Sequence, residues 1–211
     1  MTQWVENPRG GRERGPRGLL RAWAEVLVRP RRFFRNGVAP GDQAPGLAFA
    51  IAVTFVYVGS RLAFAPASVS GYARMVENTG SVYLSGLVLL GVACFLVAPL
   101  ALHLAAAVGT LTLIPTVSNR AGVSETVQVI AYATAPGVFV AYPHPAVQLA
   151  AALYGCVLLV VGFSVVHETS IPRALAAGLV PAVFVFGFAF GGIAAFESVT
   201  GVVVTPASAT G

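Results

Sequence analysis

Residues 86–107 read GLVLLGVACFLVAPLALHLAAA, a run of apolar and small side chains without any Asp, Glu, Lys or Arg. A water-soluble helix carries a polar stripe at helical spacing, whereas this run is apolar on every face. About 20 residues of this kind are enough to cross the hydrocarbon core of a bilayer. The run therefore predicts a transmembrane helix.

The rest of the chain has the same character. Apolar residues make up 56% of the 211 residues and charged residues 10%, with a mean hydropathy of +0.79, far from the balance of a soluble domain. The sequence predicts an all-α fold, a polytopic integral membrane helical bundle of five transmembrane helices preceded by an amphipathic interfacial helix. The predicted spans are residues 45–65, 82–108, 124–142, 146–166 and 173–196, within a membrane domain of residues 44–197 that a short outer tail (198–211) follows.

The second apolar run continues beyond its predicted span, up to Ile114. As one helix, residues 82–114 would be ~50 Å long at about 1.5 Å per residue, against a hydrocarbon core of ~30 Å. We expect Pro99 to kink this helix and residues 104–114 to project along or below the inner interface.

Charge divides the chain unevenly. Nine of the 13 basic residues lie before residue 43, and with four acidic residues they give this segment a net charge of +5. Because positive residues near membrane ends stay in the cytoplasm, we expect a cytoplasmic N-terminus, and an odd number of spans then places the C-terminus outside the cell membrane. Arg120 and Arg173 fall in predicted inner loops, while Arg74 alone lies in an outer loop.

The N-terminal region has two parts. Residues 1–18 contain the stretch NPRGGRERGPRG, whose composition predicts disorder. In residues 19–43, apolar and charged side chains recur on different helical faces, which predicts a helix in the membrane interface, ended or bent at Pro30. We expect the rings at headgroup depth and the arginines toward lipid phosphates. The expected membrane-interface residues are Trp23, Arg29, Arg31, Arg32, Phe33 and Phe34.

Polar residues inside predicted spans are candidates for function, because they are costly in hydrocarbon. Glu125, Gln128 and Tyr132, followed by Pro136, fall on one side of the third span at spacings of three and four residues, which aims a polar strip at the bundle interior. The strip fits either a capped helix start with an interhelical hydrogen bond or a polar pathway through the membrane. Arg61 lies toward the outer end of the first span, where it can snorkel to the headgroups.

No residue pattern predicts catalysis. The histidines, His103, His144 and His167, lack metal-ligand spacing, and His167 is not followed by a second histidine four residues later. No P-loop or dinucleotide fingerprint follows a predicted strand. We therefore expect no catalytic residue, no metal and no cofactor, and we expect that the protein is not an enzyme.

Three segments of the chain carry a family resemblance: VRPRRFFRNG at residues 28–37, ETVQVIAYATAPGVF at residues 125–139 and HETSIPRALAAGLVP at residues 167–181. In these segments the chain is similar to the Yip-one domain family, the five-span proteins named after their interaction with Ypt/Rab GTPases, and resembles its prokaryotic branch. The resemblance implies a five-helix bundle with a cytoplasmic N-terminus and no established enzymatic activity. Residues 40–46, PGDQAPG, lack the Asp-Leu-x-Gly-Pro type motif of eukaryotic members, so GTPase binding does not follow from the resemblance.

These observations favour a non-enzymatic integral membrane protein that organises membrane lipid or recruits partners through its cytoplasmic N-terminal region. The expected partners are the lipid bilayer, in which anionic lipid is one candidate, and proteins of unknown identity at the cytoplasmic face. A small transporter or channel that uses the polar strip is the alternative. The Arg/Gly-rich tail also has the composition of a nucleic-acid tether, but such tails are promiscuous and we expect no nucleic-acid partner.

Overall fold

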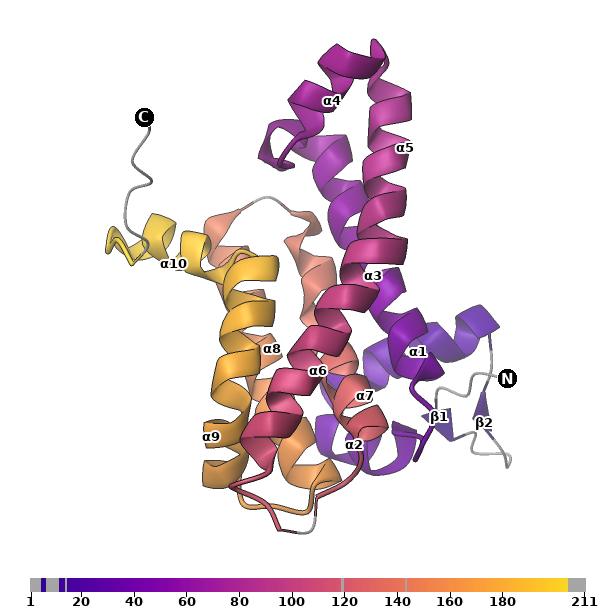
Figure 1. Cartoon of the computed structure of the whole chain (residues 1–211), viewed down its shortest axis with the longest axis vertical. Helices are drawn as coiled ribbons and strands as arrows, with labels where there is room; N and C mark the ends of the chain where they lie inside the picture. The colour runs from indigo at the N-terminus through magenta and orange to yellow at the C-terminus, as the bar shows by residue number, and fades with distance from the viewer. Residues whose placement is uncertain (1–4, 7–11, 14, 119, 143, 205–211) are drawn as a thin grey trace.

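The computed structural model describes residues 5–6, 12–13, 15–118, 120–142 and 144–204. Most of these residues are helical, and the long helices run back and forth along one direction (Figure 1). The elements are β1 (Val5–Glu6) paired antiparallel with β2 (Arg12–Glu13), α1 (Gly15–Val28), α2 (Pro30–Gly37), α3 (Ala44–Phe64), the 3-10 helix η1 (Pro66–Ser68), α4 (Tyr72–Thr79), α5 (Val82–Val92), the π-helix η2 (Ala93–Val97), α6 (Ala98–Leu113), α7 (Val123–Ala133), the 3-10 helix η3 (Ala135–Ala141), α8 (Pro145–Val166), α9 (Ile171–Ala182), the π-helix η4 (Val183–Ala189) and α10 (Gly192–Thr200).

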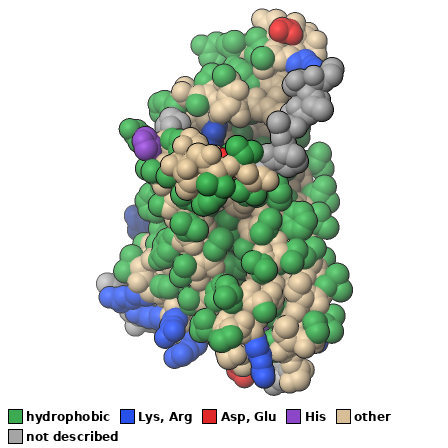
Figure 2. All heavy atoms as spheres, turned by 90° about the vertical axis from the view of Figure 1, so that its left-hand side faces the viewer, with side chains coloured by type: hydrophobic (Ala, Val, Ile, Leu, Met, Phe, Trp, Pro, Cys, Tyr) green, Lys and Arg blue, Asp and Glu red, His purple; other side chains and the backbone are tan. Residues whose placement is uncertain are grey.

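Among the described residues, four helical stretches are long and apolar enough to cross a membrane: α3, α5 to α6 (Val82–Leu113), α8, and α9 to η4 (Ile171–Ala189). Large apolar side chains lie on their outer surfaces, where Phe95, Leu100 and Phe188 are 75%, 66% and 59% exposed. Figure 2 shows hydrophobic side chains over much of one face. Surface of this kind is costly in water and compatible with lipid tails. The chain is therefore a multi-pass membrane protein.

The second apolar run forms one continuous helical stretch of 32 residues. Its middle, η2, is a π-helical segment just before Pro99. Proline clashes with the carbonyl four positions earlier, and a wider turn makes room for it. The excess length lies elsewhere than expected. Residues 104–113 stay within the bundle, where Leu113 is fully buried, while α4 and α5 extend beyond the other helices at the opposite end (Figure 1).

The last long helix contains Pro181, which cannot donate to the carbonyl of Ala177. The hydroxyl of Thr112 in α6 donates to that carbonyl at 2.6 Å, so the neighbouring helix replaces the missing hydrogen bond.

The span predicted to reach residue 196 ends earlier, at Ala189. Gly191 adopts a left-handed conformation with φ +67° and turns the chain into α10, a backbone effect that hydropathy does not register.

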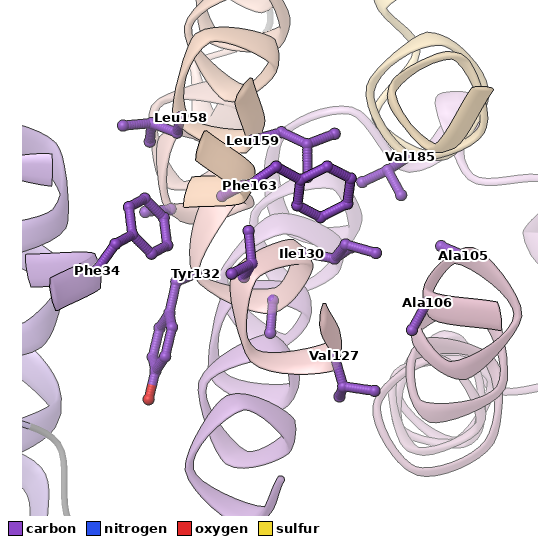
Figure 3. Packing of buried hydrophobic residues seen from close by; sticks show 14 of the residues in the cluster. Phe34, Ala105, Ala106, Val127, Ile130, Tyr132, Leu158, Leu159, Phe163 and Val185 are labelled. Atoms are coloured by element: carbon purple, nitrogen blue, oxygen red, sulfur yellow. The ribbon is translucent and has the colours of Figure 1, made fainter. Parts of the chain in front are cut away.

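α7 lies at the centre of the bundle and packs against α3, α6 and α8. All eight residues from Thr126 to Ala133 are buried, so no side of this part of the helix is exposed. Figure 3 shows Val127 and Ile130 directed toward Ala105 and Ala106 of α6. The small alanine side chains let the two helices approach closely. The core of the protein is thus built around α7.

The N-terminal region forms two helices that are separated beside Pro30, where the sequence predicts that the helix ends or bends. α1 begins at Gly15, and the chain turns at Arg29 before Pro30 starts α2. Proline suits the first turn of a helix because its missing N–H would have no partner there. Parts of the two tails lie outside the described residues, namely residues 1–4, 7–11 and 14 of the tail for which disorder is predicted and residues 205–211 of the outer tail.

Gly162 of α8 has no room for a side chain, since a Cβ atom there would lie 2.5 Å from Val129 Cγ1 and 3.0 Å from the ring of Phe34. We expect Gly162→Ala to destabilise the protein by about 1–3 kcal/mol through overpacking. Gly91→Ala is the matched control, because nothing lies within 4 Å of its Cβ position and alanine favours the helix. Thermal unfolding in detergent, followed by circular dichroism, measures both. Equal melting temperatures for the two variants would contradict this packing.

Candidate functional site at the arginine-rich end

Arginines gather at one end of the bundle. Among the described residues, six are exposed there: four on or beside α2, one between α6 and α7, and one in the first turn of α9. Figure 2 shows blue side chains concentrated at the lower end of the molecule. We call this surface the arginine face, and it comprises Arg29, Arg31, Arg32, Arg35, Arg120 and Arg173.

Two phenylalanines attach α2 to the bundle. Phe33 and Phe34 are 1% and 2% exposed, and the centroid of the Phe33 ring lies 4.7 Å from that of Tyr132 in an edge-on arrangement. Phe34 packs where Gly162 leaves space on α8. Both rings are covered by protein, although the sequence alone suggested contact with lipid headgroups. The partners come from α7 and α8, which the sequence of α2 does not reveal.

α1 is also held by the bundle. The indole N–H of Trp23 donates to the carbonyl of Ala135 at 2.8 Å, and the Trp23 ring lies 5.1 Å from that of Phe49. Near the end of α1, the hydroxyl of Tyr154 donates to the carbonyl of Leu27. α1 is therefore fixed at its middle and at its C-terminal end, which sets the direction in which the chain enters α2.

The polar strip of α7 binds the linker between α2 and α3. Gln128 is fully buried, its Oε1 accepts from the N–H of Ala39 at 2.9 Å, and its Nε2 donates to the carbonyl of Ala39 at 2.7 Å. Glu125 Oε1 accepts from the N–H of Gly41 at 2.9 Å. A Cβ atom at Gly46 would lie 2.8 Å from the Cα of Gln128, so glycine permits the close approach of α3. The strip thus positions the segment behind the arginine face.

The other intramembrane candidates lie in two places, the interior of the bundle and the end opposite the arginine face. Tyr132 is fully buried, with its ring 5.0 Å from that of Phe49, and Pro136 is buried in η3. Arg61 lies in the last turn of α3, where its Nη1 donates to Ser68 Oγ at 3.3 Å. The structure therefore keeps Tyr132 and Pro136 in the interior and leaves Arg61 far from the arginine face.

His167 is buried in the fold, a feature that its sequence context does not indicate. It follows α8, is 1% exposed, and its Nε2 lies 3.4 Å from Thr126 Oγ1. Its ring is edge-on to that of Phe163, with the centroids 5.4 Å apart. Burial lowers the pKa of His167 to about 4, against an opposing effect of Glu125 and with a smaller contribution from Arg120 in the same direction. The imidazole is therefore neutral at physiological pH.

Two pockets lie beside the features described above, a cavity next to α7 and a cleft at the arginine face. A cavity of about 160 Å³ between α3, η2, α7 and η4 is lined mostly by aliphatic side chains. A cleft of about 530 Å³ opens at the arginine face between α2 and the turn that joins α8 to α9. In the described part of the chain, no three His, Cys, Asp or Glu side chains converge in a group that could hold a metal ion.

In a comparison with known protein families, the model of the Yip1 domain matches residues 24–193 of this chain. The chain belongs to the Yip1 domain family. The resemblance carried by the three sequence segments is thereby confirmed, and the match includes the four long helices, α7 and all of α2. The Yip1 family is one of non-enzymatic membrane proteins and is linked to Rab partners. No curated protein and no solved structure matches the chain.

Acid should destabilise the protein through His167. In the unfolded chain this histidine takes up a proton near pH 6.5, whereas in the folded protein it resists protonation down to about pH 4. Its effect on stability is absent above pH 6.5, and stability falls as the pH drops from 6.5 to 4. We expect His167→Gln to flatten this part of the stability profile, measured as melting temperature in detergent. His103→Gln, at an exposed position, should keep the wild-type slope; identical slopes for both variants would contradict the assignment.

Loss of the Gln128 amide should release the linker. Gln128→Leu leaves the N–H of Ala39 without a partner and removes the shorter of the two hydrogen bonds to its carbonyl, which still accepts from the N–H of Asp42 at 3.3 Å, at a cost of about 1–3 kcal/mol. We expect faster hydrogen–deuterium exchange in residues 38–43, measured by mass spectrometry of the full chain. Gln148→Leu is the matched control, because Gln148 Nε2 donates to the carbonyl of Phe190 near α10, and its loss should affect exchange there instead. Unchanged exchange in residues 38–43 of the Gln128 variant would count against the role of the strip.

Proposed function

We propose that this Yip1-family protein is a non-enzymatic component of the cell membrane that organises membrane lipid, or recruits partners, through its cytoplasmic N-terminal region. The observation that carries the proposal is the rigid attachment of the arginine face. The arginines of α2 point outward, while Phe33 and Phe34 anchor the helix and Gln128 holds the linker behind it. Charges on a rigid support lose less conformational freedom on binding than charges on a flexible tail.

Five membrane spans are part of the proposal. α7 is short, but α7 and η3 together cover Val123–Ala141. At about 1.5 Å per α-helical residue and about 2.0 Å per 3-10 residue they extend ~30 Å, which is the thickness of the hydrocarbon core. With five traverses the N-terminal region lies in the cytoplasm and the C-terminus outside, which puts the arginine face on the side that positive residues favour. α2 then lies near the inner interface, while α1 reaches deeper along the bundle, where Trp23 bonds Ala135.

Anionic lipid is the partner chemistry that suits the arginine face. Each basic side chain near an anionic leaflet contributes about 1 kcal/mol, and this attraction decays within a Debye length of about 10 Å. The exposed guanidinium groups of α2, the α6–α7 connection and α9 lie on one surface, so a membrane plane along that surface would bring them within reach of phosphates together. Enrichment of anionic lipid around the protein is the expected consequence.

The alternative function, a small transporter or channel that uses the polar strip, receives less support. A pathway needs polar groups that face water or a substrate. The amide of Gln128 is engaged with both backbone groups of Ala39, and Tyr132 is fully buried among aromatic rings. The cavity between α3, η2, α7 and η4 is lined mostly by aliphatic side chains.

Removal of charge from α2 tests the part of the proposal in which the protein organises anionic lipid. In vesicles of phosphatidylglycerol and phosphatidylcholine, the wild-type protein should enrich phosphatidylglycerol around itself. The variant R29Q/R31Q/R32Q/R35Q should lose most of this enrichment, because up to ~4 kcal/mol of attraction is removed. Extraction with a styrene–maleic acid polymer, followed by lipid mass spectrometry, measures the lipid that stays with each protein.

The control for this experiment is Arg74→Gln, which removes an exposed arginine of α4, at the other end of the bundle, and should leave the enrichment unchanged. Truncation of residues 1–35 is a poorer test, because it also removes Phe33 and Phe34 from the core. Wild-type enrichment in the quadruple variant at low salt would overturn the anionic-lipid part of the proposal.

A further inference from the structure

The cleft at the arginine face combines charges of both signs. α2 contributes its guanidinium groups, α8 a hydroxyl and an apolar side chain, and the turn after α8 a carboxylate. Its lining residues are Arg31, Arg35, Ser164, Val165, Glu168 and Ile171. Arg31 and Arg35 are four residues apart on α2 and therefore lie on the same side of that helix. Arg29 and Arg32, which also belong to the arginine face, do not line the cleft.

The charged groups of the cleft are unpaired. Within the part of the chain that the structure describes, the side chains of Arg31, Arg35 and Glu168 form no hydrogen bond and no ion pair with one another or with other residues. The cleft therefore offers two positive groups and one negative group that are held apart. Its volume of about 530 Å³ is in the usual range for small-molecule sites, about 300–1,000 Å³.

The position of Glu168 is set by a constrained turn. Its φ of +47° lies in the left-handed region, where glycine is the usual residue after a helix. Two hydrogen bonds fix the turn: Ser164 Oγ donates to the carbonyl of Thr169 at 2.7 Å, and the N–H of Thr169 donates to the carbonyl of Ser164 at 3.0 Å. A glycine would suit this backbone better, yet the chain carries a carboxylate there.

We propose that the cleft binds the headgroup of an aminophospholipid, with the phosphate on Arg31 and Arg35 and the primary ammonium on Glu168. Guanidinium groups hold phosphate through paired N–H donors, and an ammonium donates charge-assisted hydrogen bonds to a carboxylate. In phosphatidylethanolamine the two groups are joined by two carbons, so one headgroup satisfies both signs of charge. Val165 and Ile171 supply apolar contacts for the glycerol end of the lipid.

Other headgroups match the cleft less well. Phosphatidylglycerol brings a phosphate without a cation and leaves Glu168 unpaired beside an anion. Phosphatidylcholine brings a quaternary ammonium that has no N–H to donate to the carboxylate. The inference rests on the proposed function only in that it places this end of the bundle at a membrane surface.

Native mass spectrometry of the full chain in detergent tests the proposal. The protein is mixed with equal amounts of phosphatidylethanolamine, phosphatidylglycerol and phosphatidylcholine of identical acyl chains, and the retained lipids are counted. We expect phosphatidylethanolamine to be retained about fivefold or more over each of the others. R31Q/R35Q should abolish this preference. R29Q/R32Q removes the same charge from the same helix outside the cleft and should retain it.

Glu168→Gln isolates the ammonium contact, because it keeps the backbone strain and removes the charge. It should lower the preference for phosphatidylethanolamine over phosphatidylglycerol to about onefold. Equal losses in R31Q/R35Q and R29Q/R32Q, or equal retention of phosphatidylcholine and phosphatidylethanolamine by the wild type, would overturn the proposal. Complete displacement of the lipid by inorganic phosphate would identify a free phosphate ligand instead and overturn it too.

The two proposals fail separately in these experiments. If the wild type shows no preference for phosphatidylethanolamine but still enriches phosphatidylglycerol in vesicles, the headgroup site is wrong and the general role of the arginine face stands. If phosphatidylethanolamine is retained through Arg31, Arg35 and Glu168 while vesicles show no enrichment of phosphatidylglycerol, the headgroup site stands and the anionic-lipid role is lost. Melting temperatures of all variants within a few degrees of the wild type establish that the fold is intact.

Discussion

The burial of residues 126–133 of α7 on every side is the constraint on which the rest of the structure depends. A helix in this position must find partners for its polar side chains inside the protein, since an unpaired buried amide costs about 1–3 kcal/mol. Gln128 and Glu125 find theirs in the backbone of the linker, at Ala39 and Gly41. The N-terminal region is consequently a part of the bundle that completes its core, although its composition resembles that of a tail.

Prolines impose a second demand on the same core, because each one removes a backbone donor where water is scarce. The structure compensates for these missing donors in three ways. A π-helical segment precedes Pro99, a 3-10 helix contains Pro136, and Thr112 donates to the carbonyl of Ala177 that Pro181 leaves free. The last solution requires α6 and α9 to lie side by side. The proline of α9 is therefore accommodated by a residue of the neighbouring helix.

Sequence patterns predict the helix boundaries that depend on the composition of a single segment. The spans predicted at residues 45–65 and 146–166 differ from α3 and α8 by no more than one residue at either end, because length and hydropathy are properties of one segment. The last span ends early, at Ala189, because Gly191 turns the chain through a backbone conformation that hydropathy does not register. At the site, helical spacing puts the polar residues of α7 on one side, but the partner of Gln128 lies 89 residues away and only the fold brings it close.

The packing of α2 limits how the arginine face can meet a membrane. An interfacial helix normally gains affinity by inserting its apolar side chains among lipid tails, but Phe33 and Phe34 of α2 are already covered by α7 and α8. Only the charged side remains available, so attraction to lipid relies on Coulombic forces that salt weakens. The long helices already anchor the protein in the bilayer. In the function proposed above, the charged side of α2 therefore serves to discriminate between headgroups, and the long helices provide the anchoring.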